Sequence, residues 1–427
     1  MGNIKKTMRY LKRNGFANTY YAVKERLFYK DVPFNAYENS EHFLKTETDK
    51  KFEGLFSIVV PVYETKEEHL RAMIESVIAQ DYKNWELVIG DASKTDLQKN
   101  IVLSYSDERI KYVRILENKG ISENTNVALK ESLGEFVVLL DHDDLLTGDA
   151  LSENAKMIAL ANENGIEPTL IYSDEDKCVT GDNDFFEPHI KQKFNYDLFL
   201  SNNYICHLSV IKGELARKLG FRKEYDGAQD YDFILRIVLN SEPSQILHIA
   251  KVLYHWRCHE NSTAFDPASK EYAYDAGRRA IEYFLKNKYN EDINVIELSH
   301  KGFYRPVFED IFKSRKDVGA IGHLLTEGKR FSSGIISEDG FEHYKGMNRH
   351  YSGYFHRVHL LQDVFALDLR TVTPSEEMLS DYEELVNFVK NEITLEPRED
   401  IWKDASVEFA KRLHNKNLTF LYLPDIY

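Results

Sequence analysis

The chain has 427 residues, of which 43% are hydrophobic, 29% charged and 13% aromatic. This length exceeds that of a small disulfide-stapled module, and this composition excludes a disordered protein. The 55 Lys and Arg residues against 70 Asp and Glu residues give a net charge of −15, which argues against non-specific binding of nucleic acid. If the protein binds phosphates, we expect specific groups rather than bulk charge to hold them.

The sequence predicts a cytoplasmic protein. Its three cysteines, Cys178, Cys206 and Cys258, are widely spaced and form no CxxC pair, which is typical of thiols in a reducing compartment. The sequence contains neither a run of eighteen apolar residues nor the apolar region of a signal peptide. We therefore expect neither a transmembrane helix nor a cleaved leader.

Residues 1–50 are predicted to form a helical extension with basic and aromatic side chains. The first thirty residues contain Glu25 as their only acidic residue, and their basic residues are Lys5, Lys6, Arg9, Lys12, Arg13, Lys24, Arg26 and Lys30. Such a segment either lies on an anionic membrane surface or packs its aromatic side chains on the protein with its lysines in solvent. The sequence leaves both interpretations open.

From residue 56 onward, short apolar runs alternate with amphipathic stretches. Runs at 56–62, 85–91 and 135–141 are rich in Val, Ile and Leu, which indicates strands buried on both faces. The pattern therefore predicts an α/β fold with a mostly parallel, Rossmann-like sheet flanked by helices. Ligands of such sheets bind beyond the carboxyl ends of the strands, so Asp91 and Asp141 are predicted to face one crevice.

The last of these runs continues into Asp141-His142-Asp143-Asp144. Acidic side chains two residues apart at a strand end can hold a divalent cation, Mn²⁺ or Mg²⁺, which then bridges two phosphates. The alternative is a solvated acidic turn that caps the next helix. The sequence lacks GxGxxG after the first strand and GxxxxGK[ST] throughout, so a nucleotide would not be held by those glycine-rich loops.

Four motifs in order resemble one enzyme family. FSIVVPVYETKEEHLRAMIESVIAQDYKNWELVIGDAS and ENKGISENTNVALKESLGEFVVLLDHDD are similar to the nucleotide-sugar half of inverting glycosyltransferase family 2, whose members have the GT-A fold. GAQDYDFILRI and HIAKVLYHWRCHENSTA resemble the acceptor half of members that build bacterial surface polysaccharides. The resemblance extends from about residue 55 to 265.

The resemblance implies roles for single residues. Asp230 matches the catalytic base, and Asp143 and His255 match residues that contact the metal. The positions that match nucleotide-sugar contacts are Pro61, Tyr63, Glu64, Asp91, Lys119, Gly120, Asp141 and His142. Two positions depart from the family pattern, because Ala92 stands where many members have a second Asp and Gln229 where many have Glu.

The implied partners are a UDP- or dTDP-sugar donor and a glycan acceptor that is either lipid-linked or part of a glycoprotein. One competing interpretation is a non-catalytic sugar- or nucleotide-binding assembly protein. A nucleotidyltransferase would need a basic, glycine-rich loop after the first strand, and VPVYETKEE is not one. Asp230 could instead cap the helix that follows it. A zinc site is a further alternative for Cys206, Cys258, His255 and His259, but the spacing of these residues fits no common zinc site.

A boundary is expected near residue 300. This divides the chain into the 1–50 extension, a GT-A domain at 51–300 and a smaller α/β domain at 301–427. The last part contains a predicted strand within 316–325 and a predicted helix within 376–393. It resembles part of a second GT-A domain without a DxD motif, which implies a non-catalytic role.

Overall fold

The computed structural model describes residues 47–181, 184–258, 271–395 and 400–424, and single residues between Met8 and Leu27. The chain forms two compact units, and the predicted functional boundaries near residues 50 and 300 stay a prediction. The sheet unit comprises Ser40–Phe194 and Asn203–Phe284. The C-terminal unit comprises Met1–Asn39, Asn195–Asn202 and Leu285–Tyr427.

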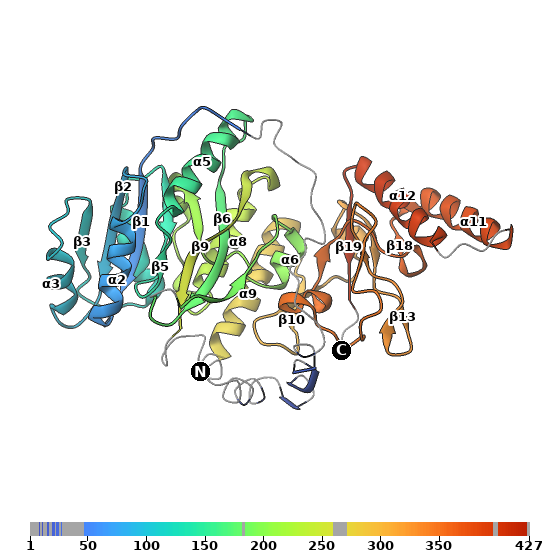
Figure 1. Cartoon of the computed structure of the whole chain (residues 1–427), viewed down its shortest axis with the longest axis horizontal. Helices are drawn as coiled ribbons and strands as arrows, with labels where there is room; N and C mark the ends of the chain where they lie inside the picture. The colour runs from blue at the N-terminus through green and yellow to red at the C-terminus, as the bar shows by residue number, and fades with distance from the viewer. Residues whose placement is uncertain are drawn as a thin grey trace. The chain divides into compact units, whose positions relative to one another are not determined.

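A nine-stranded sheet forms the centre of the sheet unit (Figure 1). Its strands follow the order β3-β2-β1-β4-β8-β6-β9-β5, and β7 pairs with β6. Strands β1 to β4 pair in parallel, β8 runs antiparallel between β4 and β6, and β6 is parallel to β9. The strands are β1 (Phe56–Val62), β2 (Trp85–Asp91), β3 (Ile110–Arg114), β4 (Phe136–Leu139), β5 (Leu145–Leu146), β6 (Leu170–Cys178), β7 (Phe186–His189), β8 (Ser209–Lys212) and β9 (Ile246–Arg257).

Helices flank this sheet, which confirms the predicted α/β fold. Helix α2 (Glu67–Ile78) buries Leu70, Met73, Ile74 and Val77, the spacing of one apolar helix face. That face belongs to the same hydrophobic core as the buried side chains of β1 and β2. The other helices with residues in this unit are α3 (Leu97–Leu103), α4 (Ile121–Glu131), α5 (Ala150–Glu163), α7 (Gly213–Leu219), α8 (Gln229–Leu239) and α9 (Glu271–Tyr289).

The register of the parallel strands determines which loops share one edge of the sheet. Val62 at the end of β1 pairs with Asp91 at the end of β2. On the other side of β1, Val59 pairs with Leu139, the last residue of β4. The segments that follow β1, β2 and β4 therefore emerge at the same edge, as expected for a ligand site of a parallel sheet.

The C-terminal unit has a separate four-stranded sheet of order β17-β19-β12-β18. Its strands are β12 (Val318–Gly322), β17 (Gln362–Asp363), β18 (Thr373–Pro374) and β19 (Thr419–Tyr422), and its longer helices are α11 (Leu379–Leu395) and α12 (Ile401–Asn415). Strand β12 and helix α11 confirm the elements predicted within 316–325 and 376–393. Shorter elements are β10 (Asn294–Glu297), β11 (Tyr304–Val307), α10 (Ile311–Ser314), β13 (Thr326–Glu327), β14 (Arg330–Phe331), β15 (Ile335–Ile336) and β16 (Glu342–His343).

A buried ion pair fixes helix α6 (Tyr196–Ser201) within the C-terminal unit. Both terminal nitrogens of Arg315 donate to the Asp197 carboxylate, at 2.7 and 3.0 Å, and both side chains are buried. Because an uncompensated charge in this core would be costly, the pair holds α6 against the later part of the chain.

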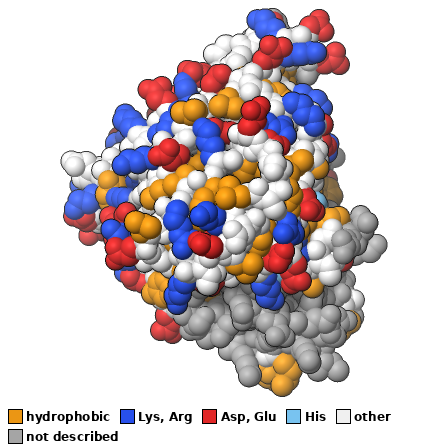
Figure 2. Space-filling view, turned by 90° about the vertical axis from the view of Figure 1, so that its left-hand side faces the viewer, with side chains coloured by type: hydrophobic (Ala, Val, Ile, Leu, Met, Phe, Trp, Pro, Cys, Tyr) orange, Lys and Arg blue, Asp and Glu red, His pale blue; other side chains and the backbone are white. Residues whose placement is uncertain are grey.

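Within the described residues, the helices are too short or too polar to cross a membrane. Most of the predicted 1–50 extension lies outside the described residues. Figure 2 looks onto the side that carries α3 and β3, where acidic and basic side chains are interspersed with hydrophobic ones. The net charge of −15 is therefore not gathered into one acidic patch on that face.

Candidate functional site

Three side chains at one edge of the sheet form a group that could hold a metal ion. They are Asp141 and Asp144, which lie between β4 and β5, and His207, which precedes β8. One ligand atom of each lies within 4.8 Å of the others. We call these three residues the acidic cluster.

Strand β9 supports the acidic cluster. The Tyr254 hydroxyl donates to Asp144 Oδ2 at 2.5 Å, and the Tyr254 ring stacks on His207 with centroids 4.6 Å apart. The Arg257 backbone N–H donates to Asp144 Oδ1 at 2.7 Å, and its Nε donates to the Asp143 carbonyl at 2.7 Å. These contacts fix the turn that carries the acidic residues.

The electrostatics of the cluster favour a bound cation. Burial raises the pKa of Asp141, and the negative charges of Asp143 and Asp230 act in the same direction against the opposing effect of His207. Burial also raises the pKa of Asp144 well above its usual value, and Asp141 adds to this. Two carboxylates and an imidazole are suitable ligands for Mn²⁺ or Mg²⁺, and a cation there would offset this repulsion.

Asp230 lies in the first turn of α8, which begins at Gln229. The residue that precedes this helix is Ala228, and no side chain caps it, so Asp230 is an acidic residue of the first turn and does not cap the helix. Asp230 Oδ2 instead accepts hydrogen bonds from Asn203 Nδ2 and Cys206 Sγ, each at 3.2 Å. The segment that supplies His207 to the acidic cluster thus also orients Asp230.

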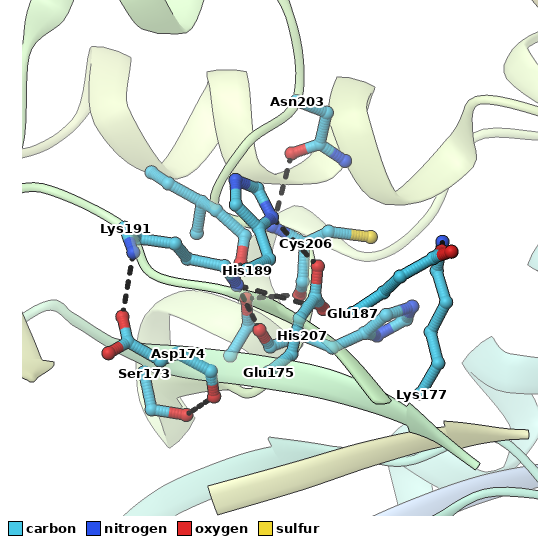
Figure 3. A network of polar contacts seen from close by, with 12 residues as sticks. Ser173, Asp174, Glu175, Lys177, Glu187, His189, Lys191, Asn203, Cys206 and His207 are labelled. Atoms are coloured by element: carbon cyan, nitrogen blue, oxygen red, sulfur yellow. Dashed lines mark hydrogen bonds and ion pairs between the residues drawn. The ribbon is translucent and has the colours of Figure 1, made fainter. Parts of the chain in front are cut away.

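A polar network holds that segment in place (Figure 3). The buried Lys191 Nζ donates to the carbonyls of Ile205, at 2.7 Å, and His207. Lys191 Nζ also lies 3.7 Å from Glu175 of β6, whose other carboxylate oxygen is 3.1 Å from His189 Nδ1. Burial alone would raise the pKa of Glu175, but Lys191, His189 and His207 outweigh it and lower that pKa to about 2.

The side chains predicted around the base and ribose follow β1 and end β2. Asp91 is fully buried, and its carboxylate accepts from the Ser93 N–H at 2.8 Å and the Tyr112 hydroxyl at 2.7 Å. Tyr63 is exposed, whereas Glu64 Oε1 accepts from the Lys94 N–H at 2.8 Å. Pro61 pairs with Gly90 within the sheet.

Gly120, one of the predicted nucleoside contacts, lies against Asp226 in the segment before α8. It has a φ of +104°, and a Cβ at this position would lie 2.5 Å from Asp226 Oδ2. Glycine is therefore required both by the backbone conformation and by the close carboxylate. The neighbouring Lys119 is exposed and lies 3.6 Å from Glu117, and His142 Nδ1 lies 3.7 Å from Asp143.

The predicted metal pair of Asp143 and His255 is not the set that forms the acidic cluster. His255 Nδ1 lies 2.5 Å from Asp176 Oδ1, and the imidazole stacks on Phe185 with centroids 3.9 Å apart. Asp143 acts on Asp141 through its charge. A role for Asp143 and His255 as metal ligands stays a prediction, and His259 of the zinc interpretation lies outside the described residues.

Asp232, two residues after Asp230, is bound by two arginines and has a structural role. Its buried carboxylate accepts from Arg222 Nε at 3.1 Å and Arg236 Nε at 3.0 Å. Asp232→Ala is expected to lower the free energy of unfolding by about 3–5 kcal/mol, because two guanidinium groups lose their counter-charge. Urea denaturation measures this, with Asp230→Asn as the matched control, and an unchanged midpoint for Asp232→Ala would contradict it.

Sequence reasoning missed His207, Lys191, Tyr254 and Arg257 as parts of the site. The first two come from irregular segments whose local sequence shows no periodicity. Tyr254 and Arg257 lie in the YHWR stretch, in which only His255 matched a family role. Alternation of side chains along the strand was an available signal for Tyr254 alone, because it places Tyr254 on the face opposite to His255.

Residues 57–220 match the family model "Glycosyl transferase family 2". The uncharacterized protein y4gI of Sinorhizobium fredii is 42% identical over 246 residues, 57% of this chain and 26% of that protein. The O-antigen biosynthesis protein RfbC of Myxococcus xanthus is 33% identical over 235 residues, 54% of this chain and 18% of RfbC.

The UDP-Glc:alpha-D-GlcNAc-diphosphoundecaprenol beta-1,3-glucosyltransferase WfgD of Escherichia coli is 32% identical over 157 residues, 37% of this chain and 59% of WfgD. The chain thus spans less than two thirds of each of these three relatives. The family match includes β1 to β4 and the acidic cluster. Residues 57–220 of this chain are therefore a glycosyl transferase family 2 domain.

Proposed function

We propose that the chain is an inverting glycosyltransferase that moves a sugar from a UDP- or dTDP-sugar to a hydroxyl of a growing surface glycan. The observation that carries this proposal is that Cys206, the residue directly before His207 of the acidic cluster, donates from its Sγ to Asp230 Oδ2 at 3.2 Å. A transferase needs a base and a diphosphate site within reach of one substrate. Asp230 and the acidic cluster are suited to these two tasks.

In the proposed reaction, Asp230 takes the proton of an acceptor hydroxyl. The oxygen of that hydroxyl forms the new bond to C1 of the donor sugar. The bond from C1 to the diphosphate breaks on the opposite side, which inverts C1 and releases the nucleoside diphosphate. A divalent cation on Asp141, Asp144 and His207 would offset the charge of the leaving diphosphate. The groups proposed to line the donor site are Pro61, Tyr63, Glu64, Asp91, Lys119, Gly120, His142 and Asp143.

Two relatives support the substrate classes. RfbC is named for O-antigen biosynthesis, and the name of WfgD gives UDP-glucose as its donor and a diphosphoundecaprenol-linked sugar as its acceptor. We extend to this chain a nucleotide-linked donor and a glycan acceptor of the lipid-linked class.

A thermal-shift panel of UDP-, dTDP- and GDP-sugars tests donor binding. At a ligand concentration of about 100 Kd, binding stabilises a protein by about 2.7 kcal/mol, which raises its melting temperature by several degrees. We expect such a shift for at least one UDP- or dTDP-sugar with Mn²⁺ and its loss with EDTA. A panel without any shift would contradict the proposed donor class.

We further propose a non-catalytic role for residues 301–427, which shape the acceptor site or bind a partner. Among the described residues of the C-terminal unit, no group of His, Cys, Asp and Glu side chains comparable to the acidic cluster occurs. This supports a division in which residues 51–300 carry the chemistry.

For residues 1–50 we propose contact with the inner face of the cell membrane, in preference to packing of the aromatic side chains on the protein. The described residues Phe16, Tyr20, Val23 and Leu27 are helical, repeat at helical spacing and have exposed side chains. An exposed apolar stripe on a basic segment is typical of helices that lie on anionic lipid. This supports a cytoplasmic protein with peripheral membrane association.

Flotation with phosphatidylserine-containing liposomes tests this contact. Each basic residue near the lipid contributes about 1 kcal/mol, so binding is expected at about 50 mM salt and should be lost at about 500 mM. Phe16→Asp combined with Leu27→Asp should abolish flotation, whereas Phe388→Asp on α11 should not. Flotation of the double variant at the wild-type level would contradict the contact.

A further inference from the structure

A groove of about 470 Å³ lies in the sheet unit, and none of the three residues of the acidic cluster lines it. Its walls come from α2, from β5 and the turn after it, and from Thr180, Gly181 and Phe185. His255 of β9 also lines it. The volume is within the range of about 300–1,000 Å³ that is usual for small-molecule sites.

The groove and the acidic cluster lie on opposite faces of β9. Side chains alternate along a strand, and the rings of Tyr254 and Trp256 lie 4.6 and 6.0 Å from that of His207. His255, between them, points the other way and reaches the groove. The groove is therefore separate from the cluster proposed to hold the donor diphosphate, and His255 belongs to the groove.

The lining combines an aromatic face with hydrogen-bonding groups. Phe185 is 40% exposed, and its ring stacks on the imidazole of His255 at an interplanar angle of 18°. Glu75, Thr147 and Thr180 add a carboxylate and two hydroxyls to the wall. A flat apolar face next to a few polar groups suits a ring that has both an apolar face and hydroxyls.

The carboxylates at the groove favour a neutral occupant over an anionic one. Asp176 Oδ1 lies 2.5 Å from His255 Nδ1, so Nε2 is the ring nitrogen that is left for a ligand hydroxyl. Glu75 adds a second carboxylate, and no Lys or Arg is among the lining residues of the described groove. The nearby guanidinium of Arg257 donates to the carbonyls of Val179 and Thr180, so a phosphate in the groove would meet two carboxylates and one cation that is already engaged.

We propose that this groove is a carbohydrate-binding site, separate from the donor site, that takes a neutral saccharide. This inference rests on the proposed function in one respect, namely that the saccharide would be part of the glycan that the enzyme extends. The groove would then hold the acceptor chain outside the reaction centre. Binding itself requires no turnover of a donor.

The experiment is titration calorimetry of the full chain with neutral tetrasaccharides of glucose, galactose, N-acetylglucosamine and rhamnose. At least one is expected to bind. Phe185→Ala removes the stacking face and should weaken that binding about tenfold, and Ala72→Trp should block it by filling the groove. The matched control is Phe388→Ala, another exposed phenylalanine, which should bind as wild type does.

UDP with Mn²⁺ provides the second readout. Its affinity should be the same in wild type, Phe185→Ala and Ala72→Trp, and it should not displace the saccharide. The inference is overturned if none of the four saccharides binds, if both groove variants bind as wild type does, or if UDP competes. Saccharide binding without any turnover of a nucleotide sugar would support the groove and count against the proposed transferase.

Discussion

Asp230→Asn is expected to lower kcat by about 10²–10⁴-fold while the KM for the donor stays nearly unchanged. The amide has the shape of the carboxylate and can keep the contact with Asn203, but it cannot take a proton from the acceptor. Because the helix is not capped by this side chain, the melting temperature should also stay the same. Steady-state kinetics and thermal unfolding of one preparation measure both quantities.

A matched variant makes the loss specific. Asp149→Asn changes a carboxylate of the same sheet unit that pairs with Lys251 on the surface, and it should retain wild-type turnover. A folded Asp230→Asn enzyme with kcat within a few-fold of wild type would contradict the assignment of the base. Asp232 would be a poor replacement since two arginines bind it, and Asp144 is already held by Tyr254.

Asp141→Asn and His207→Gln are each expected to weaken UDP binding in the presence of Mn²⁺ by at least about 100-fold. Each removes one ligand atom from the acidic cluster, so that the cation no longer compensates the charge of the diphosphate. Wild type in EDTA should show the same weak affinity as the variants. Titration calorimetry with UDP, at matched Mn²⁺ concentrations, gives these affinities.

The same titration decides between two sets of metal ligands. The acidic cluster predicts that His255→Gln keeps its Mn²⁺-dependent affinity, because His255 contacts Asp176 and Phe185 instead. The pair implied by family resemblance predicts that His255→Gln and Asp143→Ala lose it and that His207→Gln keeps it. Equal affinities of all four variants with and without EDTA would exclude both sets.

The parallel half of the sheet was predictable from the sequence because its signals are local. Strands β1 and β2 are runs of Val and Ile that are buried on both faces, and α2 repeats its apolar residues at helical spacing. Asp141 could be identified for the same reason, since it directly follows such a run. Burial and periodicity determine these elements without long-range contacts.

The rest of the site depends on contacts between distant segments, which no local pattern encodes. Lys191 orders the backbone before His207, and that backbone in turn supplies Cys206 to Asp230. Strand alternation places the His255 side chain on the face opposite to Tyr254, and its role as a metal ligand, implied by its motif, stays a prediction. A motif identifies the strand, whereas the face of the strand on which each side chain lies follows from pairing.

The central claim is that the chain transfers a sugar with inversion at C1. Its most direct measurement is ¹H NMR of the purified chain with Mn²⁺ and the donor found in the thermal-shift panel, with a hydroxyl acceptor or water. The account predicts release of the nucleoside diphosphate, strictly dependent on the metal, and a first-formed product whose anomeric configuration is opposite to that of the donor. A donor that stays intact, as expected for a non-catalytic binding protein, or a product with retained configuration would contradict it.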